Sequence, residues 1–247
     1  MKADPFAQLK LLDVQSLDSR HDQLRHRMAT LPENVELAEL NRRRAELDDR
    51  ARDAKIAFDD LTRAQKRADA DVEQVKARRK RDQDRMEQGL ISSAKDLERM
   101  QQELVSLERR IGELEDTELE IMEQLEDAQR ELEAVTTEVA ELDARIAATT
   151  QARDGSAKEI DEQLAQTVAE RQQTASGMPE DLMKLYLRLR EHKGGVGAAA
   201  LRARSCTGCS LVLNASELGD IAKAPSDEVL RCEECDRILV RTSESGI

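Results

Sequence analysis

Aromatic residues are nearly absent from this sequence, which has two Phe, one Tyr and no Trp among its 247 residues. Large aromatic side chains usually dominate burial in a globular core, so this composition excludes a conventional globular domain of the same length. The apolar contacts must come from Leu, Ile, Val, Met and Ala instead. Because 37% of the residues are charged, the chain is expected to be either disordered or built from long solvated helices.

Long apolar runs are missing as well. The sequence has no stretch of about 18 apolar residues that could cross a membrane, and its first residues, MKADPFAQLKLLD, lack the apolar segment of a signal peptide. We therefore expect a cytoplasmic protein with no membrane contact. The net charge of −13 argues against nucleic-acid binding through bulk charge, although it leaves a local basic patch possible.

The middle of the chain has the heptad repeat of a coiled coil. From Leu97 to Ile146 apolar residues recur every three or four positions for about seven heptads, and only Glu118 interrupts them. This repeat is longer than a globular helix sustains. An earlier arm, from Leu37 to Met86, keeps a weaker repeat over a similar length. The periodicity therefore favours long helices over disorder.

The two arms are predicted to form an antiparallel hairpin. The segment between them, EQGLISSAKDLE, contains Gly89, which suits the end of one helix. It also contains Ser93 and Asp96, which resemble the capping box that starts the next. A short break between arms of matched length places the tip of the hairpin near residues 88–94.

The distribution of charge supports pairing of the arms within one chain. Residues 42–85 hold 15 Lys+Arg against 11 Asp+Glu, whereas residues 96–143 hold 4 Lys+Arg against 17 Asp+Glu. Opposite charges attract across the flanking positions of a coiled coil, and two copies of the acidic arm repel each other. We therefore expect a monomer or a weak homodimer.

Further breaks suggest how the chain is divided. Pro32 suits the first turn of a new helix and lies in a phase break at residues 30–34, while the heptads of the opposite arm fade at 147–155. Interruptions of both arms at one level would make a hinge. We predict a hairpin over residues 1–176 with this hinge, followed by a connecting helix and a terminal module over residues 177–247. A helix is expected over 180–192, and then a flexible joint at GGVG.

All four cysteines lie in two C-x-x-C pairs, Cys206 with Cys209 and Cys232 with Cys235. A redox centre, a disulfide, a catalytic metal site and a structural metal site could each use such a cluster. A thioredoxin-like motif would need a βαβ pattern, which is absent, and a reducing cytoplasm disfavours disulfides.

A catalytic zinc keeps one position open, whereas four thiolates can close a tetrahedron around a structural Zn²⁺. An iron–sulfur cluster can also use four cysteines, but the paired spacing matches zinc ribbons better. The apolar residues that flank each pair predict short strands, with the cysteines on two hairpin turns. Metal binding would then supply much of the folding energy of so small a sheet.

The C-terminal motifs resemble those of bacterial coiled-coil hairpin proteins that end in a C4-type zinc ribbon. The resemblance rests on LMKLYLRLR, GGVGAAAL, CTGC and CEECDRILV, and it covers nearly the whole chain. This sequence departs from the usual pattern at Asp236, where Gly is usual, and at Val240, where an aromatic residue is usual. The family is described as nucleic-acid-binding, and some members are linked to an alternative sigma factor, flagellar gene control or RNA binding. The resemblance implies the architecture and a partner in gene expression.

Two groups of basic residues are candidate contacts with nucleic acid or a partner. The group near the tip could grip phosphates, but no aromatic residue lies near it for base stacking, and it is also typical of a solvated coil face balanced by the acidic arm. The group around the cysteines is diluted by acidic neighbours, so protein contact is at least as plausible there. The first group is Lys76, Arg78, Arg79, Lys80 and Arg81, and the second is Arg202, Arg204, Arg231, Arg237 and Arg241.

No pattern in the sequence supports catalysis, so no catalytic residue and no small-molecule substrate is expected. The predicted fold is mostly α, a long antiparallel coiled-coil hairpin with a small C-terminal β zinc ribbon. The predicted function is that of a non-enzymatic adaptor with one structural Zn²⁺, which binds RNA, DNA or a protein of the transcription or gene-expression machinery. The alternative is a purely structural spacer that bridges two proteins through the hairpin tip and the ribbon.

Overall fold

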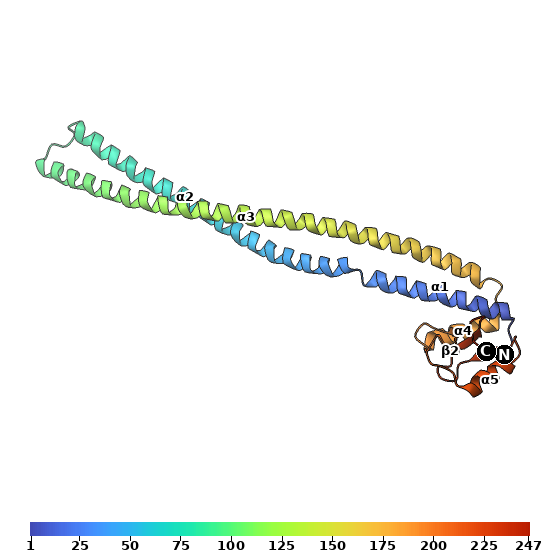
Figure 1. Ribbon diagram of the computed structural model, residues 1–247. Coiled ribbons are helices and arrows are strands. Elements are labelled where there is room, and N and C mark those ends of the chain that lie inside the picture. Colours follow the sequence, from blue (N-terminus) through green and yellow to red (C-terminus); the bar gives the residue numbers. More distant parts are fainter. The chain divides into compact units, whose positions relative to one another are not determined.

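The computed structural model describes residues 1–247 and confirms the predicted fold class. Three long helices come first, followed by a short helix and a small sheet with a further helix inserted in it (Figure 1). None of the helices combines the length and the apolar composition that a membrane span requires. The helices are α1 (Pro5–Ala29), α2 (Pro32–Glu87), α3 (Ala94–Ala175), α4 (Glu180–His192) and α5 (Ala215–Lys223), and the strands are β1 (Ala198–Arg202), β2 (Ser205–Cys206), β3 (Leu230–Arg231) and β4 (Ile238–Arg241).

The chain forms two compact units. The first unit combines Met1–Asn34 with Gln151–Ile247, and the second unit is Val35–Thr150. The boundaries therefore differ from the predicted division near residue 176. The difference arises because α1 packs with the C-terminal residues, a long-range contact that periodicity along the chain does not reveal.

The second unit is an antiparallel pair made by α2 and the first part of α3. The turn occupies residues 88–93, where the hairpin tip was predicted, and Gly89 has the positive φ of +64° expected there. The seam residues of the heptads are buried between the helices, as in the cluster of Leu40 and Leu47 with Leu142. Other buried seam residues include Leu37, Ala68, Val72, Leu107, Ile111 and Val135.

Ion pairs connect the two arms in the way that their charges predict. Arg44 of α2 contacts Asp143 of α3 at 2.6 Å, and Arg50 contacts Glu131 at 2.9 Å. The hydrogen bonds that the Arg44 guanidinium donates to Asp143 and Asp48 raise its pKa further above the ordinary value. Exposed pairs of this kind add little to stability, so they contribute more to the orientation and register of the arms.

Glu118, which interrupts the heptads, lies half-buried in the seam. Partial loss of solvent and a hydrogen bond with Asp69 of α2 raise the pKa of the Glu118 carboxyl. A polar residue at a core position selects one register at a cost in stability. Glu118 and Asp69 therefore face each other where an apolar pair would pack better.

The predicted hinge is wrong, because only one of the two arms is interrupted at that level. The first arm breaks between Ala29 and Pro32, but α3 continues as helix through residues 147–155. Weak heptad spacing removes seam contacts, yet this segment contains no proline, and its one glycine, Gly155, costs only about 1 kcal/mol relative to Ala. Just beyond it Ile160 packs in the buried cluster with Leu31, which holds the helix in place.

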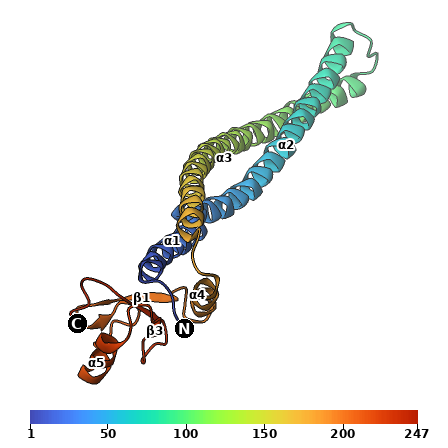
Figure 2. The same ribbon diagram turned by 90° about the vertical axis from the view of Figure 1, so that its right-hand side faces the viewer.

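The sheet of the first unit has the strand order β2-β1-β4-β3, with β1 and β4 parallel and both outer pairs antiparallel. One face of this sheet shares a core with α1 and α4 (Figure 2). Leu11 and Val14 of α1 are fully buried there together with Tyr186 of α4 and Ile238 of β4. The helices thus supply apolar surface that so small a sheet lacks.

Buried polar side chains of α1 hold the connection between α4 and the sheet. Gln15 accepts a hydrogen bond from the N–H of Gly197 at 2.7 Å and donates to the carbonyl of Gly195 at 3.0 Å. Asp18 accepts from the Tyr186 hydroxyl and from Arg171 Nε, each at 2.7 Å. The expectation of a flexible joint at GGVG is therefore wrong, because its backbone is tied to α1.

We predict that Gly197→Ala destabilises the first unit by about 1–3 kcal/mol, the usual effect of overpacking. A Cβ at this position would lie 2.6 Å from the backbone carbonyl oxygen of Tyr186. Tyr186 is the only tyrosine of a chain without tryptophan, so its fluorescence during denaturant unfolding reports on this core.

Gly155→Ala is the matched control, because a Cβ there meets nothing within 4 Å. This change should raise the stability by up to about 1 kcal/mol through helix propensity. If Gly197→Ala unfolds at the same denaturant concentration as the wild type, the close approach of Tyr186 is not a constraint.

Candidate metal centre

The two C-x-x-C turns have the same backbone geometry. The N–H of Ser210 donates to the carbonyl of Cys206 at 2.7 Å, and the N–H of Asp236 donates to that of Cys232 at 2.8 Å. Ser210 and Asp236 both have positive φ values, of +62° and +63°. A left-handed residue therefore follows each pair. Asp adopts this conformation more readily than most residues other than Gly, so Asp236 preserves the turn.

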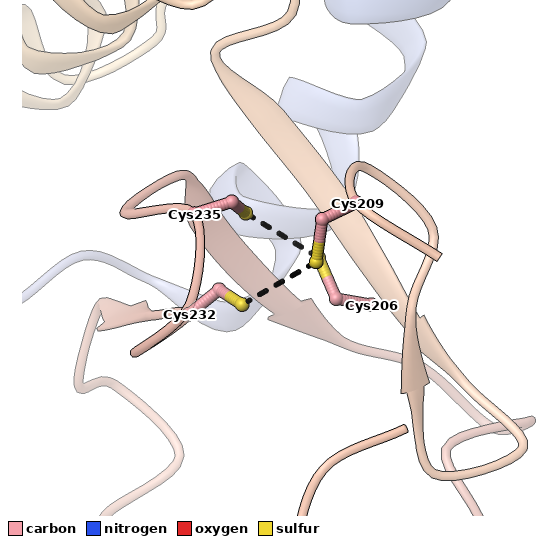
Figure 3. Close-up of side chains that lie close together, drawn as sticks. All are labelled: Cys206, Cys209, Cys232 and Cys235. Atoms are coloured by element: carbon pink, nitrogen blue, oxygen red, sulfur yellow. Dashed lines mark hydrogen bonds between the residues drawn. The ribbon is translucent and has the colours of Figure 1, made fainter. Parts of the chain in front are cut away.

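The turns bring four sulfur atoms together (Figure 3). Cys206 Sγ lies 3.9 Å from Cys235 Sγ, Cys209 Sγ lies 3.9 Å from Cys232 Sγ, and all four sulfurs are within 4.8 Å of one another. A tetrahedral zinc with Zn–S bonds of about 2.3 Å requires sulfur–sulfur distances of about 3.8 Å. The four cysteines therefore fit one structural Zn²⁺, as predicted.

The surroundings of the sulfurs shift the pKa values of the thiols in opposite directions. Burial raises the pKa of the Cys232 thiol to about 12 and also raises that of Cys206. At Cys235 burial is opposed by hydrogen bonds from the backbone and side chain of Arg237, which lower the pKa to about 7. Zinc binding must displace the protons of the high-pKa thiols, so metal affinity rises with pH.

Comparisons with known proteins agree with this geometry. Residues 14–194 match the family described as the CT398-like coiled coil hairpin domain, and residues 205–239 match the C4-type zinc ribbon domain. The chain belongs to the CT398-like coiled-coil hairpin family. A protein of Mycobacterium tuberculosis, found in two strains, is 34% identical over 241 residues, which cover 98% of each chain. The family resemblance noted in the sequence is confirmed.

Solved structures share the fold. A protein from Mycobacterium smegmatis is 32% identical, with a TM-score of 0.84, and the match covers 98% of this chain and 100% of that one. CT398 from Chlamydia trachomatis is 17% identical, with a TM-score of 0.65 over 96% of this chain and 98% of its own. At that identity the likeness shows the hairpin fold alone.

Arg237 of the zinc ribbon joins three separate backbone segments. Its guanidinium donates to the carbonyls of Val196 at 2.9 Å, Gly208 at 3.1 Å and Lys193 at 2.8 Å. Gly208 lies within the first C-x-x-C turn, whereas Arg237 follows the second. The side chain thus ties both cysteine turns to the end of α4, an internal role that sequence analysis did not identify.

The other four candidate arginines of the ribbon also have partners within the chain. Arg241 donates to the carbonyl of Ala224 at 2.7 Å, at the C-terminal end of α5, and Arg204 donates to that of Gly246 at 3.1 Å. Arg202 pairs with Glu244 and Arg231 with Asp236. Each of these arginines thus has a role in contacts within the ribbon.

Three of the five basic residues near the tip are paired with acidic residues, and two are not. Lys76, Arg78 and Arg79 form ion pairs with glutamates of α3 at 2.6–2.7 Å. Lys80 and Arg81 are exposed and have neither an ion pair nor a side-chain hydrogen bond. The acidic arm therefore neutralises three members of the predicted patch and leaves two.

Sequence analysis also missed α5, which lies between the two cysteine turns. The side chain of Asn214 caps this helix by accepting from the N–H of Glu217 at 2.8 Å. Asn followed by Glu three residues later is a signal for a helix start that could have identified it. Of the short strands predicted beside the cysteine pairs, the one that would follow Cys209, at residues 211–213, is reduced to a single bridge between Val212 and Ser205.

We predict that Cys232→Ser abolishes the one-to-one binding of zinc, because three thiolates cannot close the site. Since the sheet shares its core with α1 and α4, Tyr186 fluorescence should change as well, while circular dichroism should show the helices of the second unit retained. Metal analysis by mass spectrometry gives the zinc content. Full zinc content with unchanged Tyr186 fluorescence would contradict a four-cysteine site.

We predict that Arg237→Gln releases zinc to a chelator faster than the wild type, by roughly tenfold, the lower range for loss of an outer-shell contact. Arg231→Gln is the control, because Arg231 ends β3 just before the same cysteine turn but bonds only to Asp236. Equal release rates for the two variants would show that the three carbonyl contacts do not hold the centre together.

Proposed function

We propose that the protein is a non-enzymatic adaptor whose zinc ribbon and paired helices bind another protein. The observation that carries this proposal is that the metal centre is built as a structural one. The four clustered cysteines can fill all four positions of a tetrahedral zinc and would leave none for a substrate or an activated water. The metal therefore shapes a surface and performs no chemistry.

The way the ribbon is attached supports a rigid binding surface. Its sheet packs on α1 and α4, and Gln15 and Asp18 fix the connecting segment from within. A surface that is ordered before binding loses less conformational entropy when a partner docks. Such an arrangement suits the presentation of a fixed surface.

The charges favour a protein over a nucleic acid as the partner. Five of the ten candidate basic residues are paired with carboxylates within the chain, three more are bonded to backbone carbonyls, and the protein carries a net charge of −13. Phosphate binding depends on uncompensated Lys and Arg. The family resemblance supports a partner in the gene-expression machinery, and a zinc–thiolate centre is suited to the reducing cytoplasm.

Nucleic-acid binding near the hairpin tip is a second candidate function. It is favoured by Lys80 and Arg81, which are adjacent, exposed and free of acidic partners. These two residues could contact one phosphate group or two neighbouring ones. A contact of this size would give weak binding that is strongly reduced by salt.

Two measurements on the zinc-loaded protein test these functions. Affinity purification from the native host, with and without nuclease, should recover a protein partner that nuclease treatment does not remove. Recovery of nothing but nucleic acid, or loss of every protein after nuclease, would contradict the adaptor function.

Fluorescence anisotropy with labelled RNA and DNA at low salt provides the second measurement, and we expect no specific binding. Lys80→Ala/Arg81→Ala is compared with Lys66→Ala/Arg67→Ala, which removes another exposed basic pair of α2. Binding that disappears only in the first variant would establish the tip as a nucleic-acid contact instead.

A further inference from the structure

An open groove of about 430 Å³ lies on the zinc ribbon between α5 and the second cysteine turn. Four acidic residues line it, namely Glu217, Asp220, Glu228 and Glu233, and Ile221 and Leu230 are among its apolar residues. The carboxylates are not gathered closely enough to hold a metal ion, because only the four cysteines form such a group. The groove is thus an extended acidic surface with an apolar component.

Glu217 is the unusual member of this groove. It is only 7% exposed, yet its carboxylate forms no ion pair and accepts only a long hydrogen bond of 3.5 Å from the N–H of Glu233. At the third position of a helix a Glu side chain often returns to the N–H of the capping residue, but no such bond to Asn214 forms here. A buried carboxylate is normally paired, so Glu217 lacks a cation.

Two basic residues, Lys223 and Arg231, also line the groove, but neither pairs with Glu217. The guanidinium of Arg231 is bonded to the carbonyl and the carboxylate of Asp236, and Lys223 is exposed at the end of α5 without an ion pair. The adjacent zinc–thiolate centre adds further negative charge, because four thiolates outweigh one Zn²⁺. The groove therefore repels phosphates and attracts positive groups.

We infer that this groove binds a basic segment of a partner protein, with an arginine paired to Glu217. A guanidinium matches a carboxylate through two parallel hydrogen bonds and loses its hydration more easily than an ammonium does. The aliphatic part of the arginine would cover Ile221 and Leu230. The inference rests on the proposed adaptor function, since it specifies the chemistry of the protein that is bound.

The test uses full-length, zinc-loaded protein and a fluorescein-labelled peptide of alternating Arg and Leu residues. We expect salt-sensitive binding, measured by anisotropy, that Glu217→Gln weakens by about tenfold, as for the loss of one charge-assisted hydrogen bond. A peptide with Lys in place of Arg should bind more weakly. Zinc content and Tyr186 fluorescence establish that each variant is folded.

A second comparison uses two exposed residues, so that its outcome does not depend on replacing the buried Glu217. Glu233→Gln removes a carboxylate that lines the groove, whereas Glu234→Gln removes its neighbour, which does not line it. We expect only Glu233→Gln to weaken peptide binding. Equal effects of the two changes, or none, would overturn the inference and assign the binding to the overall negative charge.

Capture from the native host separates failure of this inference from failure of the adaptor function. If the wild type and Glu217→Gln/Glu233→Gln recover the same protein in equal amounts, the adaptor function stands and the groove is not its contact. If neither recovers any protein, the adaptor function itself fails. Concentration-dependent sedimentation of the wild type alone, abolished in the double variant, would show that a second copy of this chain fills the groove and would also overturn the inference.

Discussion

The convergence of four cysteine sulfurs on one point is the constraint on which the ribbon depends. Its two longest strands have five and four residues, too few to exclude water from both faces of a sheet. Zinc binding in small domains contributes about 10–16 kcal/mol, which is comparable with the whole stability of a typical protein. The metal thus replaces the large apolar core that a chain so poor in aromatic residues cannot build there.

The second support of the ribbon is its attachment to the helices, which makes it part of a larger unit. One face of the sheet is covered by α1 and α4, and Tyr186, the only tyrosine, is fully buried at their contact. Burial and the hydrogen bond to Asp18 both raise the pKa of Tyr186, so the hydroxyl remains a neutral donor at ordinary pH. Arg237 also holds both cysteine turns in place, because it follows the second turn and donates to a backbone carbonyl of the first and to two carbonyls after α4.

Sequence analysis predicted those features that depend on local periodicity or spacing. The heptads located both arms, the break at EQGLISSAKDLE located the turn, and the two C-x-x-C pairs located the metal centre. It could not predict that α1 belongs with the ribbon, because Gln15 and Gly197 are separated by 182 positions and neither residue has a distinctive pattern. It placed a break at 147–155 because fading heptads indicate lost seam contacts, whereas helix continuity depends on propensity and on packing at residues such as Ile160.

The basic residues show why composition alone did not determine their role. Arg237 and Arg241 were candidates for phosphate contact because they are charged, but their planar groups reach several carbonyls at once and serve as internal ties. Lys76 and Arg79 likewise balance glutamates of α3. Because these basic side chains are engaged within the molecule, the acidic residues without partners say more about what can bind. An uncompensated, buried carboxylate such as Glu217 is then more informative about the partner than any of the exposed arginines.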